Sequence, residues 1–162
     1  MFETTDAATE KFGMPETLPL TQFLKAVLLL QVIVVLVLVA AASAKGSSGN
    51  AGVVFVLNGA LTLVKAALIF GVIRALKKGS KIACYIVLVA AALGIVYVLA
   101  TFEPDRSMRY LGLAEFKYVL NIVNLAGASL GIYLSVRTLR NLKALEADQA
   151  AANVQKAGGS AD

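Results

Sequence analysis

Seven polar or charged residues lie inside apolar stretches of this sequence, and they are the residues best placed to do chemistry. They are Gln31, Asn58, Lys65, Glu115, Lys117, Asn121 and Asn124. A charged side chain inside a bilayer costs about 2.5–3.5 kcal/mol on insertion scales, so such residues are candidates for function. Their amide, ammonium and carboxylate groups suit interhelical hydrogen bonds, ion pairs and the lining of a polar pathway.

Helical spacing groups most of these candidates on two predicted faces. The first face carries Asn58, Thr62 and Lys65, and the second carries Lys117, Asn121, Asn124 and Ala128. At about 1.5 Å of rise per residue, the candidates also fall into two layers. The outer layer holds Asn58, Glu115 and Lys117, and the deeper layer holds Gln31, Lys65, Asn121 and Asn124. Because the depths match, we expect the two faces to meet across a helical bundle.

In that arrangement the Lys65 ammonium finds an amide oxygen of the deeper layer, and Glu115 pairs with a cation or amide of the outer layer. Each group also has a purely structural interpretation. Lys65 lies about 13 Å of helix from Arg74, so a stretched side chain reaches the headgroups. Glu115 and Lys117 do not share a helical face and fit an interfacial helix start. The amides fit interhelical hydrogen bonds, which average about 0.6 kcal/mol.

The composition excludes most catalytic chemistry. The chain has no His and a single cysteine, Cys84. This excludes His-ligated haem and metal sites, His general-base catalysis, an intrachain disulfide and a Cys-x-x-Cys redox pair. The sequence also lacks a phosphate-binding glycine loop, a Gly-x-Ser-x-Gly elbow and a His-Glu-x-x-His motif. We therefore expect neither an enzyme nor a cofactor or metal site.

The apolar content of the chain indicates a membrane protein. Its 162 residues are 59% hydrophobic and 15% charged, whereas soluble domains have about 45–50% and about 25%. Four apolar runs cover residues 26–44, 51–73, 82–102 and 110–136. Each is long enough to cross a ~30 Å hydrocarbon core as a helix. The sequence predicts an all-α integral membrane four-helix bundle, antiparallel because the links are short.

The distribution of basic residues predicts the orientation of the bundle. Ten of the fifteen Lys and Arg residues lie in the N-terminal segment, the middle link and the C-terminal segment, against three on the opposite side. The positive-inside rule then places both termini in the cytoplasm, and we expect a bacterial inner membrane. Topology and contact with anionic lipid account for the net charge of +5, so we expect no nucleic-acid partner.

The sequence divides into three parts. Residues 1–19 form a polar cytoplasmic segment, 20–136 form the spanning domain, and 137–162 form a basic amphipathic helix extension with a disordered tail. A frayed helix end is the alternative for the extension. Cleavage after Ala44 is the alternative for the first run, since Ala-Ser-Ala there resembles a signal-peptidase site. The acidic residues before that run favour its retention.

Two functions fit these features. The favoured one is a packing or accessory protein that binds a membrane partner or itself, because small-residue pairs such as Gly127 and Gly131 allow helices to approach closely. The alternative is an oligomeric channel or transporter, in which Lys65, Asn121 and Asn124 form a cationic constriction. The expected partners are the lipid bilayer, a second copy and another membrane protein.

Overall fold

A computed structural model of the chain describes residues 15–44, 48–104, 109 and 112–158. These ranges contain a short 3-10 helix η1 (Pro15–Thr17), the helices α2 (Leu18–Ala44), α3 (Ser48–Lys77), α4 (Lys81–Ala100) and α6 (Ala114–Gly158), and no strand. All four α-helices are long and apolar enough to cross a membrane. The prediction of an all-α fold with four helices of span length is thereby confirmed. Residues 1–14, which make up most of the expected polar N-terminal segment, lie outside the described residues.

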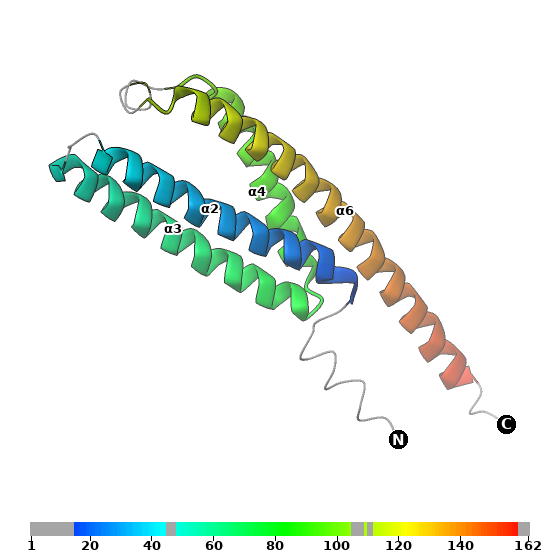
Figure 1. The fold of residues 1–162 in the computed structure, drawn as a ribbon. Coiled ribbons are helices and arrows are strands. Elements are labelled where there is room, and N and C mark those ends of the chain that lie inside the picture. The colour runs from blue at the N-terminus through cyan, green and yellow to red at the C-terminus, as the bar shows by residue number, and fades with distance from the viewer. Residues whose placement is uncertain (1–14, 45–47, 105–108, 110–111, 159–162) are drawn as a thin grey trace.

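The helices associate as two pairs. α2 packs along α3, and α4 packs along α6, whereas the contacts between the two pairs are less extensive. Figure 1 shows α2 and α3 side by side, and α6 running on beyond the other helices towards the C-terminus. The interior of the molecule therefore lies between an α2/α3 pair and an α4/α6 pair.

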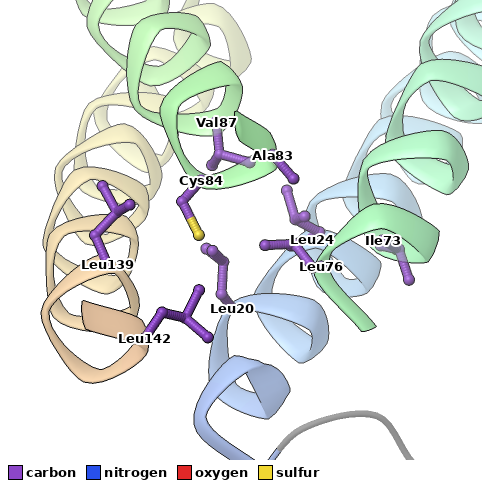
Figure 2. Close-up of a cluster of buried hydrophobic side chains, with 9 residues drawn as sticks. All are labelled: Leu20, Leu24, Ile73, Leu76, Ala83, Cys84, Val87, Leu139 and Leu142. Atoms are coloured by element: carbon purple, nitrogen blue, oxygen red, sulfur yellow. The ribbon is translucent and has the colours of Figure 1, made fainter. Parts of the chain in front are cut away.

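The hydrophobic core lies where the start of α2, the end of α3 and the start of α4 meet α6, and Figure 2 shows its side chains. It consists of Leu20, Leu24, Ile73, Leu76, Ala83, Cys84, Val87, Leu139 and Leu142, and we call it the end cluster. The helices bury little else: 6% of the residues in the most apolar stretch of α2 and 22% of those in α4 are buried, and three of the four buried residues of α4 belong to the end cluster. Apolar surface on this scale has to be covered by lipid or by a partner.

Helix α2 begins at Leu18, eight residues before the apolar run that starts at residue 26. Pro19 lies in its first turn, where the missing N–H removes no helical hydrogen bond. Leu20 and Leu24 are one turn apart and both face the end cluster, while Lys25 is exposed. The first turns of α2 are more polar than the apolar run that follows them. Burial of these two leucines accounts for their helical structure.

The turn between α3 and α4 is closed by backbone hydrogen bonds around a glycine. Gly79 has φ 74°, a left-handed conformation that glycine adopts without steric cost. Its N–H donates to the Leu76 carbonyl at 2.8 Å, and the Ser80 N–H donates to the Ala75 carbonyl at 3.1 Å. This is the Schellman pattern, which satisfies the last carbonyls of a helix. The turn therefore positions Leu76 and Ala83 in the end cluster.

Helix α6 has 45 residues, about 67 Å of helix against a ~30 Å hydrocarbon core. Leu139 and Leu142, from the expected amphipathic extension, are buried in the end cluster. Farther along α6, Glu146 forms an ion pair with Lys81 at the start of α4. Glu146 is 62% exposed, so this pair contributes no more than about 1 kcal/mol. Beyond it the described side chains are exposed, and α6 leaves the bundle as a single helix (Figure 1).

Candidate functional site

A cavity of about 670 Å³ lies between the two helical pairs. All four helices line it, with residues from within 23–38 of α2, 61–72 of α3, 86–91 of α4 and 120–128 of α6. Leu24 and Val87 belong both to the cavity wall and to the end cluster. The end cluster therefore forms the floor of the cavity.

Four polar side chains form a belt partway along this cavity, and the remaining lining residues are apolar. The polar belt consists of Gln31 on α2, Thr62 and Lys65 on α3, and Asn124 on α6. Lys65 precedes Leu76 of the end cluster by eleven residues, or about 16 Å of helix. This distance is about half the thickness of a ~30 Å hydrocarbon core.

The Lys65 ammonium has no counter-charge in this cavity. Within the part of the chain that the structure describes, it makes no hydrogen bond or ion pair, and no acidic residue lines the cavity. Lys65 is exposed in the structure, and a charged side chain within an apolar, membrane-spanning stretch is costly unless it is paired. The cavity is therefore suited to a molecule that brings a negative charge or a hydrogen-bond acceptor to Lys65.

The structure places three of the seven predicted candidates in the cavity, namely Gln31, Lys65 and Asn124. All three come from the predicted deeper layer, and Thr62 joins them from the predicted face of Lys65. The expected bond from Lys65 to a neighbouring amide is not formed among the described residues. The lysine donor is thus left available to another molecule.

Asn121, the fourth member of the deeper layer, lies elsewhere. Its side chain is 1% exposed, and its Nδ2 donates to the Phe102 carbonyl at 2.9 Å, just beyond the end of α4. Next to it, the rings of Phe102 and Tyr118 pack with centroids 5.7 Å apart. Asn121 therefore links α6 to the segment that follows α4, which agrees with the interpretation of this amide as an interhelical hydrogen-bonding group.

Two of the three outer-layer candidates, Glu115 and Lys117, do not line the cavity. Glu115 and Lys117 lie at the beginning of α6, where Glu115 is exposed and Lys117 half-buried. A carboxylate in the first turn of a helix is favoured by the helix dipole. Their positions agree with an interfacial helix start. The side chain of Asn58 lies outside the described residues.

Gly127 and Gly131, the predicted small-residue pair on α6, have different surroundings in the structure. A Cβ placed on Gly131 would lie 3.1 Å from Phe23 Cε1 and 3.6 Å from the Ala91 Cβ. Gly131 is therefore where α6, α2 and α4 approach closely. A Cβ on Gly127, one turn earlier, would meet no atom within 4 Å, because this residue lines the cavity. The sequence signal of two glycines four apart did not distinguish a helix contact from a cavity wall.

Asn121 and Asn124 provide a matched pair for testing the structural role of Asn121. Asn121→Leu removes a buried donor and leaves the Phe102 carbonyl unpaired, which is expected to lower the free energy of unfolding by about 1–3 kcal/mol. Asn124→Leu changes an exposed side chain and is expected to stay within about 0.5 kcal/mol. Unfolding of both variants in mixed micelles measures the difference. Equal losses would show that the Phe102 contact contributes nothing.

Comparisons of the chain with protein-family models, with curated proteins and with solved structures find no match. Among the described residues, no group of three or more His, Cys, Asp or Glu side chains is placed to hold a metal ion. The chemistry of the cavity is therefore the main guide to function.

Proposed function

We propose that this chain is a small multi-pass membrane protein that acts as an accessory protein by binding a molecule resident in the membrane. The cavity between the two helical pairs is the proposed binding site. The observation that carries this proposal is the unpaired Lys65 in a mainly apolar wall. A polar group in the wall of an apolar site gives the site specificity, since it disfavours molecules that leave the group unpaired.

Negative charge is the property expected of the partner. Glu115 is the one acidic residue inside an apolar run of this chain, and it belongs to the outer layer rather than to the depth of Lys65. A second copy in the same membrane therefore brings no acid to the depth of Lys65. Self-association through the outer helix faces, where a Cβ on Gly71 or Gly94 would meet no atom within 4 Å, is compatible with the proposal but leaves the cavity free.

Native mass spectrometry after mild extraction from the native membranes tests this function. Wild-type protein is expected to carry a bound partner at fixed stoichiometry. Lys65→Leu is expected to reduce its occupancy by about tenfold or more, since hydrogen bonds to charged groups contribute about 1.5–3 kcal/mol. Lys25→Leu is the matched control, because Lys25 is an exposed helical lysine that does not line the cavity. Wild-type protein without a partner, or undiminished occupancy in Lys65→Leu, would contradict the proposal.

We further propose an up-and-down course through the inner membrane, with both termini and the end cluster towards the cytoplasm. The exposed basic residues near the end cluster support this orientation: Arg74, Lys77, Lys78, Arg137, Arg140 and Lys143. This is the distribution that the positive-inside rule associates with the cytoplasmic face. A fluorescent-protein fusion to the C-terminus is expected to fluoresce, and activity of a periplasmic reporter fused there would contradict the orientation.

Transport is the second candidate function. The observation that favours it is a cavity with polar groups at half depth and a floor at one end, a shape from which one rearrangement of the floor would open a path. In this account Lys65 attracts anions. Reconstituted wild-type protein is expected to release trapped anions, with Lys65→Leu at least about tenfold slower. The absence of flux from both proteins would remove this candidate.

A further inference from the structure

The size of the cavity limits what it accepts. A helix with side chains is about 10–12 Å wide and rises about 1.5 Å per residue, so each residue occupies on the order of 120 Å³. A cavity of about 670 Å³ therefore holds no more than about six residues of a partner helix, whereas a crossing helix has about 20. Sites of roughly 300–1,000 Å³ are typical of small molecules.

The lining of the cavity is polar at one depth and apolar at another. Between the polar belt and the floor, the lining side chains are apolar, including Phe23, Val27, Ile69 and Val72. Lys65 and Val72 are seven residues apart on α3, so this apolar section is about 10 Å deep. An occupant that satisfies both parts has an apolar chain of about that length and one anionic group.

We propose that the cavity binds a single-chain anionic amphiphile, with its carboxylate or phosphate on the Lys65 ammonium. This inference rests on the proposed binding function and names the class of its ligand. The amides of Gln31 and Asn124 and the hydroxyl of Thr62 supply further hydrogen bonds around the anionic group. The chain of the amphiphile lies towards the floor, against the apolar section below the polar belt.

Burial of the chain and pairing of the charge contribute separately to binding. Each buried methylene of an acyl chain contributes about as much as in transfer from water to hydrocarbon, which makes affinity rise with chain length. Such a gain is also offered by the surrounding bilayer, so it does not by itself retain a ligand in the cavity. The charge-assisted hydrogen bond to Lys65 has no equivalent in the bilayer interior, and it is therefore the source of specificity.

Titration of the full chain in neutral detergent, followed by native mass spectrometry, tests this inference. The probes are decanoate, decyl phosphate and decanol, which all have ten carbons and differ in the head group. Both anions are expected to saturate at one per chain and to bind at least about tenfold more tightly than decanol. The ratio of the dissociation constants of decanoate and decyl phosphate then shows whether the site prefers a carboxylate or a phosphate.

Variants separate the role of Lys65 from the integrity of the fold. Lys65→Leu is expected to bind anions and decanol equally, whereas Lys65→Arg and the control Lys25→Leu keep the preference. If Lys65→Leu does not fold, Lys65→Gln serves as the test variant in its place and is expected to lose the preference for anions.

Equal binding of anions and alcohol by wild-type protein would overturn the inference. If wild-type protein from native membranes carries a protein partner and shows no preference for anions, the proposed function stands and this inference fails. If it carries no partner and binds no probe, both fail.

Discussion

Gly131→Leu is expected to separate α6 from α2 and to lower the free energy of unfolding by about 3 kcal/mol or more. A Cβ at this position would already lie 3.1 Å from Phe23 Cε1 and 3.4 Å from its Cζ. A leucine adds three further carbons at a point where three helices meet. Overpacking of a close contact costs about 1–3 kcal/mol, and more where the backbone has to move. Unfolding in mixed micelles measures the loss.

Gly71→Leu is the matched control for this prediction. A Cβ on Gly71 would meet no atom within 4 Å, and the residue is exposed on α3. The same substitution there is expected to change the free energy of unfolding by no more than about 0.5 kcal/mol. A comparable loss in both variants would mean that the contact between α6 and α2 does not hold the two pairs together.

Gly127→Leu is expected to keep the fold and to lose the ligand. Gly127 lies one turn before Gly131, but it faces the cavity, and a Cβ there would meet no atom within 4 Å. A leucine side chain therefore fits into the cavity and occupies space that the ligand needs. Stability is expected to change by less than about 1 kcal/mol, because no packed neighbour is displaced. Occupancy measured by native mass spectrometry is expected to fall by about tenfold or more, which corresponds to about 1.4 kcal/mol.

The control for added bulk is Ala126→Leu on the same helix. Ala126 is exposed and does not line the cavity, so its substitution is expected to leave occupancy unchanged. Full occupancy in Gly127→Leu would place the ligand outside the cavity. Equal losses in both variants would point to a general effect of bulk on α6.

Hydropathy predicted the number of spanning helices, the end of α2 and both ends of α4 to within two residues, but not the start of α2 or the end of α6. α2 begins at Leu18 because Leu20 and Leu24 pack in the end cluster, although polar residues surround them in the sequence. α6 continues to Gly158, far beyond the last apolar residue of its span. Averaged hydropathy reports only what a bilayer solvates, whereas a helix continues as long as its packing and its helix-forming residues support it.

Depth along the helices could be read from the sequence, but direction around each helix axis could not. Counting residues placed Gln31, Lys65 and Asn124 in one layer, and the structure brings these three to one cavity. Asn121 lies at a similar depth, yet it turns towards α4 and binds the Phe102 carbonyl. That acceptor exists only because α4 ends beside α6. Such tertiary acceptors do not appear in helical spacing, and neither does a cavity, which depends on how far apart two helical pairs are held.

Site-specific photocrosslinking in native membranes tests the central claim most directly, that binding takes place in this cavity. A diazirine amino acid is placed either at Leu30, which lines the cavity, or at Leu29, which is 62% exposed and does not. The two positions are adjacent on α2 and lie at nearly the same depth. The probe at Leu30 is expected to capture one discrete anionic molecule, and Lys65→Leu is expected to abolish that adduct. The probe at Leu29 is expected to capture mixed bilayer lipids in both backgrounds. The same lipid mixture from both positions would contradict the account.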